Sequence, residues 1–334
     1  MHDTLKHLMW PLIALGVLLL FNAAVNPEFF SVKLTDGRLA GSLIDVLDRA
    51  TPVVLIALGM TLVIATAGVD LSVGAVMAMA GSLAAMLLTE MQLPLPLVIV
   101  LSLGLSLLAG VWNGVLVSVA GIQPIVATLI LMVAGRGVAQ LITDGQIIPI
   151  ENNADFAFIG GGSLLGLPFT VILAFGMILL TAAVLRLTAL GMFIESVGGN
   201  ENASRHAGLN VRSVRIAAYG FTGLCAGLAG LIYTSDITAA DANNAGLYLE
   251  LDAILAVVLG GTSLMGGRFF LLGSVVGALI IQTLNTTILM TEINGASVPA
   301  EYNLIIKALV VFVVCLLQSD AIKQMIVRRR AIHA

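Results

Sequence analysis

Long apolar runs separated by short polar breaks dominate the sequence. They predict ten membrane spans, at residues 8–25, 51–67, 71–89, 95–119, 125–142, 168–185, 216–234, 251–265, 269–290 and 303–318. A helix needs about 20 apolar residues to cross the hydrocarbon core of a bilayer. The runs at 51–67, 251–265 and 303–318 are shorter, which makes them candidates for broken or half-crossing helices.

The segment 26–50 is the first polar interruption of this pattern. It mixes aromatic and aliphatic residues with several charges and is too polar to cross, so we expect a connector or an interfacial helix on the membrane surface. The apolar run before it follows a single lysine, and no small-residue cleavage site stands out after it. We therefore expect a retained span and not a cleaved signal peptide.

Composition places the chain in the bilayer. Hydrophobic residues make up 59% of the 334 residues and charged residues only 10%, whereas a soluble domain has about 25% charged residues. The sequence predicts an all-α, polytopic integral membrane protein with one transmembrane domain over 1–334 and a membrane bundle over 8–318. A net charge of −4 gives no sign of nucleic-acid binding. Neither the two cysteines, which lie in apolar runs, nor the four histidines show metal-ligand spacing.

The basic residues lie on one side of the predicted membrane. By span counting, the loop 186–215, Arg268 and the basic tail 319–334 share a side, and the opposite loops after residue 50 contain no Lys or Arg. Lys and Arg accumulate on the cytoplasmic side. We therefore expect both termini, this loop and the tail to be cytoplasmic, with the connector 26–50 as the one exception to the charge partition.

The segment 186–215 is the longest polar interruption in the second half of the chain. Asn200 is suited to cap a short helix, because Asn side chains accept from the free N–H groups of a first turn. Gly208 is suited to end it in the left-handed conformation. We expect a two-turn cytoplasmic helix at 200–207 that contacts a cytosolic partner. An ordinary solvated connector is the alternative.

Small residues repeat at helical spacing in three predicted spans. Such small-xxx-small pairs let helix backbones approach closely. The pairs are Gly110 with Gly114, Gly223 with Gly227, and Gly273 with Gly277. Helix packing alone explains them.

Polar residues near the breaks and inside the spans are candidates for a gate or a translocation path. Asp70 and Ser72 lie where one span ends and the next begins, and they form either a gate or a helix cap. Arg136 lies inside a span, where a charge marks a pathway or a partner unless it snorkels to the interface. Asn113 is a polar companion on the preceding span.

The acidic outer loop around residues 241–252 offers a second set of polar groups. Asn243 and Asn244 precede Glu250 and Asp252, which begin the short run at 251–265. These groups are suited to line the outer mouth of a path for a hydroxyl-rich solute. Capping of the helix that begins there is the alternative reading.

Three functional classes fit a chain of this kind. None of the four lysines is followed by Ser or Thr or ends a Gly-rich loop, so the usual phosphate-cradling loop is absent from the sequence. A permease subunit driven by a separate ATPase and an ion-coupled secondary transporter both fit. The scarcity of Asp and Glu in the middle of the spans favours the first. A membrane enzyme is disfavoured, because the spans contain no Ser/His/Asp, Cys/His or metal constellation.

Several segments resemble the membrane subunits of bacterial ATP-binding-cassette importers for monosaccharides, the ribose/xylose/arabinose permease family. The resemblance covers about 8–318 and is carried by residues 57–64, 68–76, 109–114, 127–129, 136–137, 189–191, 198–208 and 260–267. Within the family, residues 127–143, 241–247 and 249–258 are most similar to a galactofuranose importer permease.

The resemblance implies an inner-membrane permease that moves a monosaccharide inwards by alternating access. The implied partners are a periplasmic sugar-binding protein, a fused double ATPase that holds ATP and magnesium, and a second, non-identical permease; no cofactor is implied on this chain. The family coupling helix, which docks into the ATPase, falls at about 200–207. Its implied coupling residues are Gly191, Glu195, Gly198, Asn200, Ala203, Arg205, Ala207 and Gly208.

Overall fold

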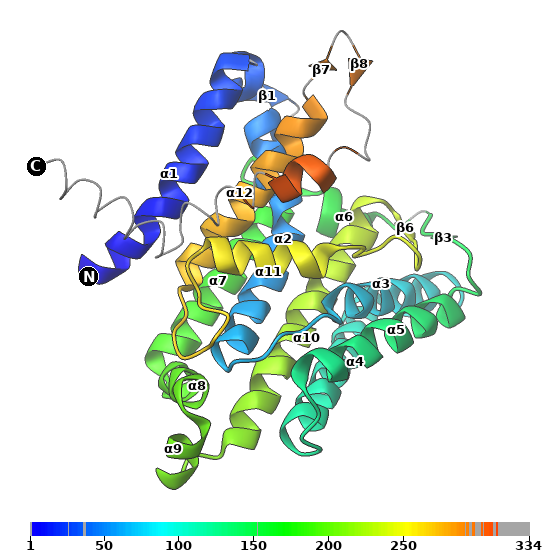
Figure 1. The fold of residues 1–334 in the computed structure, drawn as a ribbon. Helices are drawn as coiled ribbons and strands as arrows, with labels where there is room; N and C mark the ends of the chain where they lie inside the picture. The colour runs from blue at the N-terminus through cyan, green and yellow to red at the C-terminus, as the bar shows by residue number, and fades with distance from the viewer. Residues whose placement is uncertain are drawn as a thin grey trace, which may run out of the picture.

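The computed structural model describes residues 2–25, 27–35, 38–151, 153–290, 292–293, 296–297, 302, 304–309 and 312. The described chain is a bundle of helices of unequal length (Figure 1). The helices are α1 (His2–Val25), η1 (Pro27–Phe30), α2 (Ser42–Ala65), α3 (Val73–Thr89), α4 (Leu95–Ser118), α5 (Pro124–Ile142), α6 (Ala154–Gly161), α7 (Phe169–Leu187), α8 (Leu190–Gly199), α9 (Glu201–His206), α10 (Val211–Asp236), α11 (Leu249–Leu259) and α12 (Leu271–Met290).

The strands form only short antiparallel pairs in the connections. They are β1 (Lys33–Thr35) with β2 (Arg38–Ala40), β3 (Ile148–Pro149) with β6 (Ala239–Ala240), β4 (Ser163–Leu164) with β5 (Leu167–Pro168), and β7 (Glu292–Ile293) with β8 (Ala296–Ser297). Of these pairs, β3–β6 joins connections far apart in the chain.

Seven of the described helices are long and apolar enough to cross a membrane, namely α1, α2, α4, α5, α7, α10 and α12. The apolar helix α3 has 17 residues, and α11 has only 11. The predicted short helix at 251–265 is therefore confirmed as too short to cross alone. Most of the predicted span at 303–318 and the whole tail 319–334 lie outside the described residues; 304–309 are helical.

The prediction of a broken helix at 51–67 is wrong. Helix α2 begins at Ser42 and runs for 24 residues. The predicted connector 26–50 therefore ends at Gly41, and Asp45, Asp48 and Arg49 belong to the helix. All three line a cavity at the start of α2, with Asp48 half-buried and Asp45 and Arg49 exposed. A charge in a span is tolerated where it faces such a cavity.

Helices α2, α10 and α12 form the centre of the bundle. In α2, 78% of the apolar window is buried, and in α10 and α12 67%, against 22% for α4 and α5 and 17% for α7. The outer helices present apolar faces, as expected for a protein solvated by lipid. Helix α1 packs against α12, where the Asn22 Nδ2 atom donates to the Thr287 Oγ1 atom at 2.7 Å.

Glycines bring α4 and α10 into close contact. A methyl group added at Gly223 would lie 2.2 Å from the Ser106 carbonyl oxygen, and one at Gly110 would lie 2.3 Å from the Tyr219 carbonyl oxygen. The same relation joins α11 to α12, where a methyl group on Gly277 would lie 1.9 Å from the Ala256 carbonyl oxygen. The sequence prediction that the three small-residue pairs mark close helix packing is confirmed.

Gly223→Ala is expected to destabilise the protein by about 1–3 kcal/mol, the usual result of overpacking. Gly104→Ala on α4 is the matched control, because nothing lies within 4 Å of its added methyl group. Alanine is also the better helix former. Thermal unfolding in detergent measures both variants. Equal melting temperatures for the two would contradict the packing argument.

Candidate functional site

The short helix predicted between Gly199 and Gly208 is present as α9. The Asn200 Oδ1 atom accepts from the Ala203 N–H at 2.9 Å and caps the first turn. Gly208 has a φ of 85°, and its N–H donates to the Arg205 carbonyl, while the Leu209 N–H donates to the Ser204 carbonyl. These two bonds form a Schellman motif, which satisfies the last carbonyls of a helix. The predicted cap and stop are both confirmed.

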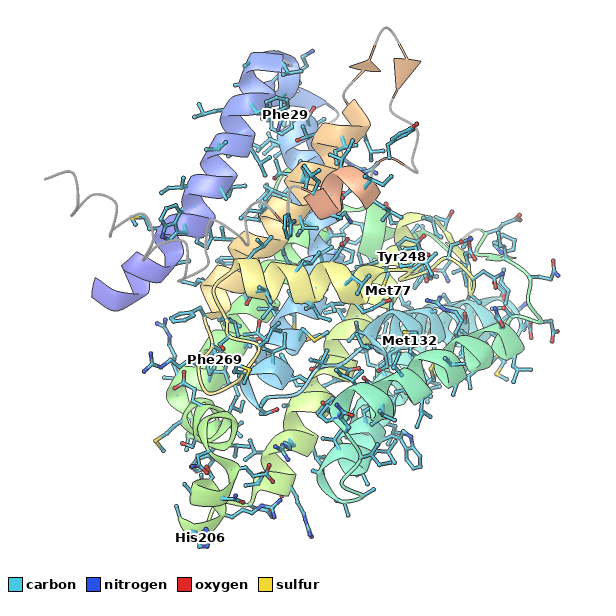
Figure 2. All side chains as sticks on the ribbon, viewed as in Figure 1. Phe29, Met77, Met132, His206, Tyr248 and Phe269 are labelled. Atoms are coloured by element: carbon cyan, nitrogen blue, oxygen red, sulfur yellow. The ribbon has the colours of Figure 1, made fainter. Side chains whose placement is uncertain are left out.

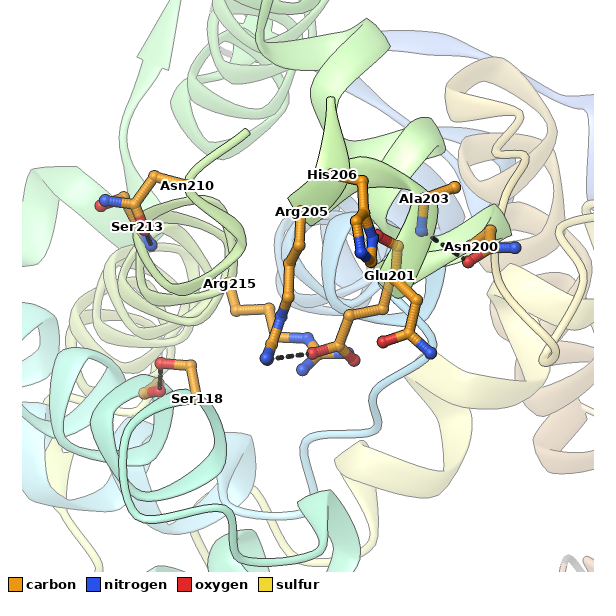
Figure 3. A network of polar contacts seen from close by, with 11 residues as sticks. Ser118, Asn200, Glu201, Ala203, Arg205, His206, Asn210, Ser213 and Arg215 are labelled. Carbon is orange, nitrogen blue, oxygen red and sulfur yellow. Dashed lines mark hydrogen bonds and ion pairs between the residues drawn. The ribbon is translucent and has the colours of Figure 1, made fainter. Parts of the chain in front are cut away.

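A salt-bridge network fastens α9 to the N-terminal part of α10 (Figure 3). Glu201 pairs with Arg205 on its own helix and with Arg215 on α10, the latter at 2.7 Å. Partial burial opposes ionisation of Glu201, but the hydrogen bonds and charges of Arg215 and Arg205 outweigh it and hold the pKa of Glu201 below its usual value. The helix is therefore held in one orientation.

The outer surface of α9 is exposed. Ser204 is buried against the bundle, whereas Ala203, Arg205, Ala207 and Gly208 are exposed. His206 lies at the tip of the molecule, far from Phe29 at the other end (Figure 2). Such a rigid, projecting helix is suited to contact a partner.

Helix α8 connects α9 to the rest of the bundle through backbone contacts. A methyl group on Gly191 would lie 2.5 Å from the Leu185 carbonyl oxygen. One on Gly198 would lie 1.8 Å from the Ala65 carbonyl oxygen and 2.6 Å from the Gly267 nitrogen. The Gly267 N–H donates to that same Ala65 carbonyl at 3.0 Å. We call this meeting of α8, α2 and the α11–α12 loop the three-glycyl junction, after Gly198, Gly266 and Gly267, all of which lie in it. Glu195 is half-buried on α8.

Asp70, Ser72 and Asn113 come together at the break between α2 and α3. Asp70 is 1% exposed, and its Oδ1 atom accepts from the Ser72 N–H at 2.9 Å and the Ser72 hydroxyl at 2.6 Å. The Asn113 Nδ2 atom donates to the Ser72 Oγ atom at 2.8 Å. Ser72, not Asp70, is the N-cap residue of α3. The prediction that Asp70 itself caps α3 therefore needs correction. Its carboxylate instead binds Ser72, the residue at the N-cap position.

Arg136 holds the acidic loop between β6 and α11. Its Nη1 atom donates to the Ala242 carbonyl at 2.9 Å and to the Ala245 carbonyl at 2.6 Å. The charged end of Arg136 therefore faces protein carbonyls of the outer loop rather than lipid. Backbone carbonyls away from water need such donors. A charge inside a span is expected to have a partner, and the partner of Arg136 is the loop between β6 and α11.

The loop held by Arg136 is also ordered by its own side chains. Asp241 accepts from the backbone N–H groups of Asn243 and Asn244 at 3.0 and 3.1 Å, and Gln140 donates to the Asn243 Oδ1 atom at 2.7 Å. Burial of Asp241 is slight, and its hydrogen bonds to Asn244 and Asn243, with the charge of Arg136, lower its pKa below the usual value. Asn243 and Asn244 are thereby fixed at the surface.

Glu250 and Asp252 lie in the first turn of α11 but have different surroundings. The Glu250 Oε2 atom lies against Gly74 of α3, 2.8 Å from where a methyl group would stand. Asp252 forms a largely buried ion pair with Lys307, at 2.8 and 2.9 Å. The alternative reading of Asp252 as a cap is wrong, since its carboxylate binds this lysine.

Lys307 is the residue that sequence reasoning missed. It is the only lysine inside a predicted span. A single lysine at such a position could have indicated a buried ion pair. Its partner is 55 residues away in the chain, so no local pattern connects the two. The predicted path residues therefore form three clusters: Asp70 with Ser72 and Asn113, the Arg136 loop, and Asp252 with Lys307. Glu250 lies apart, against α3.

Comparison with known proteins defines the class. Residues 42–315 match a family described as a permease component of the branched-chain amino acid transport system. The match covers most of the chain, so the protein belongs to this family of multi-pass permeases. It is a transport subunit of an ATP-binding-cassette importer and not an enzyme; a separate ATPase hydrolyses ATP, and a substrate-binding protein completes the importer. This finding supports the importer over the ion-coupled alternative.

Relatives resemble the chain over nearly its whole length. It is 55% identical to the galactofuranose transporter permease protein of Escherichia coli (strain K12), over 94% of this chain and 92% of that protein. It is 39% identical to the fructose import permease protein of Bifidobacterium longum (strain NCC 2705), over 98% and 93%. It is 37% identical to the ribose import permease protein of Escherichia coli (strain K12), over 92% of each.

Arg136→Met is expected to loosen the loop at residues 241–248, because two carbonyls lose their donor. Hydrogen–deuterium exchange of that loop should rise by about tenfold to a hundredfold, since a hydrogen bond from a charged group contributes about 1.5–3 kcal/mol. Arg212→Met, at an exposed position of α10, should leave the exchange unchanged. Parent-like protection in Arg136→Met would contradict the role given to Arg136.

Proposed function

We propose that this chain is the permease through which an ATP-driven importer moves a monosaccharide into the cytoplasm by alternating access, with galactofuranose as the first sugar to test. The 55% identity over 94% of the chain to a permease named for galactofuranose carries the proposal. The other two relatives are also named for sugars, fructose and ribose. The family description names branched-chain amino acids, so the substrate is argued from the relatives.

The proposed assembly places this chain in the bacterial inner membrane with both termini in the cytoplasm, as the distribution of Lys and Arg favours. Its partners would be a periplasmic sugar-binding protein, a fused double ATPase that holds ATP and magnesium, and a second, non-identical permease. In this assembly α9 is the coupling helix. Its exposed surface and the salt bridges of Glu201 with Arg205 and Arg215 support that role, since a coupling element must be both reachable and rigid.

Uptake should require ATP and no ion gradient. The importer, with this chain, its ATPase, its partner permease and its binding protein, is reconstituted in proteoliposomes with ATP inside. Uptake of radiolabelled galactose, which includes the furanose form, should persist when ionophores collapse the proton and sodium gradients. Loss of uptake under those conditions would contradict the proposal, as would robust ATP hydrolysis by the purified chain alone.

Substitutions on α9 should uncouple the importer. Ala207→Arg combined with Gly208→Glu is expected to reduce uptake by more than about tenfold, because bulky charges block the docking surface and Gly208 has a left-handed conformation that non-glycine residues disfavour. Ala207→Arg alone separates the two effects, since it keeps Gly208. Uptake and binding-protein-stimulated ATP hydrolysis are measured with equal amounts of permease in the membrane.

The matched control for α9 is Ala120→Arg, at an exposed position in the turn between α4 and α5. It adds the same charge to a turn that span counting places on the same side of the membrane. Parent-like uptake by this control with loss of uptake in Ala207→Arg is the expected pair of results. Normal uptake in the Ala207 and Gly208 double variant would overturn the coupling assignment.

A further inference from the structure

A polar cavity of about 560 Å³ lies among α2, α3, α7, α10, α11 and α12. Its volume falls within the range of about 300–1,000 Å³ typical of small-molecule sites. Part of its wall is apolar, with Pro52, Met77 and Ile232. The rest is unusually polar for the interior of a membrane bundle, where intramembrane polar and ionisable residues mark functional sites.

The polar wall of this cavity combines acceptors and donors from separate helices. Asp45 and Asp48 on α2, Asp236 on α10 and Asp252 on α11 supply carboxylates, Arg49 on α2 supplies a guanidinium, Tyr233 supplies a hydroxyl and an aromatic ring, and Gln282 and Asn285 on α12 supply amides. A carboxylate or an amide oxygen accepts from a hydroxyl, and an amide N–H donates to one. This inventory fits an uncharged ligand with several hydroxyl groups.

One of these groups has no partner in the described chain. The Asn285 Oδ1 atom is buried and accepts no hydrogen bond from any described residue. Asp48 accepts from the Thr170 hydroxyl. Asp236 is exposed, and no ion pair or hydrogen bond to its side chain is found among the described residues. A buried acceptor without a partner, such as the Asn285 Oδ1 atom, is unfavourable, so it commonly marks a place for a ligand or water.

A metal ion fits this cavity less well than a sugar. Among the described residues, no group of three or more His, Cys, Asp and Glu side chains is close enough to hold an ion. Asp252 is already neutralised by Lys307 at 2.8 Å. The remaining carboxylates are Asp45 and Asp48 on α2 and Asp236 on α10, and they come from two separate helices.

The cavity lies at the end of α10 farthest from the coupling helix. Asp236 is the last residue of α10, whereas α9 lies just before its first residue, Val211. At about 1.5 Å per residue, the two ends of that helix are on the order of 40 Å apart. In the orientation proposed above, the cavity is on the periplasmic side, where a binding protein would release its sugar.

We propose that this cavity is a binding site for one monosaccharide in transit, with Asp236 and Asn285 among its hydroxyl-binding groups. The inference rests on the proposed function and deepens it, because it places the solute inside a single permease chain. The Arg136 loop and the Asp70 cluster are then structural supports beside the path.

Removal of these groups should slow transport without breaking the coupling to ATP. In the reconstituted importer, Asp236→Asn and Asn285→Leu are each expected to reduce galactose uptake by about tenfold or more, the loss for one hydroxyl hydrogen bond. ATP hydrolysis stimulated by the sugar-loaded binding protein should stay close to that of the parent. Asp155→Asn, at an exposed position of α6, is the matched control and should transport normally.

Labelling measures occupancy directly. A charged thiol reagent should modify Asn285→Cys more slowly when excess galactose is present during turnover, and Asp155→Cys at an unchanged rate. Parent-like uptake by both cavity variants would overturn the inference. If uptake and ATP hydrolysis fall together, the labelling decides: protection by galactose supports the cavity, and equal rates overturn it. Failure of the unmodified importer to take up any monosaccharide would instead disprove the proposed function.

Discussion

Satisfaction of backbone hydrogen-bonding groups away from water is the constraint on which this fold depends. A helix satisfies its own backbone inside a bilayer, but every break exposes N–H and C=O groups that protein must cover. At the α2–α3 break, Asp70 accepts from the Ser72 N–H. In the loop before α11, Arg136 donates to two carbonyls. At both places a charged side chain supplies hydrogen bonds that the interrupted backbone needs.

Close helix approach is the second consequence of a lipid solvent. Association of helices in a membrane relies on packing rather than on the exclusion of water. The glycines of α4, α10 and α12 allow backbones to touch where a single methyl group would collide with a carbonyl oxygen. The central helices are thus fixed tightly to one another, whereas the outer helices retain large apolar faces for lipid or a second subunit.

The features that sequence could predict are those set by local chemistry. Apolar runs placed most helices within a few residues, and Asn200 with Gly208 defined α9 because a cap and a stop depend only on near neighbours. The features it missed depend on residues distant in the chain. Asp45 and Asp48 appeared too polar for a span, because the cavity they line is built by five other helices. The pairing of Asp252 with Lys307 was invisible for the same reason.

The three-glycyl junction has a mechanical consequence. At Gly198 the backbone of α8 rests on the last carbonyl of α2 and on Gly267, with no side chain between them to bend or rotate. A shift of α8 cannot be absorbed by rotamer changes at that point, so it must move the end of α2 and the start of the α12 segment together. The junction is a pivot shared by three elements. The junction is stiff because these glycines have no side chains between the touching backbones.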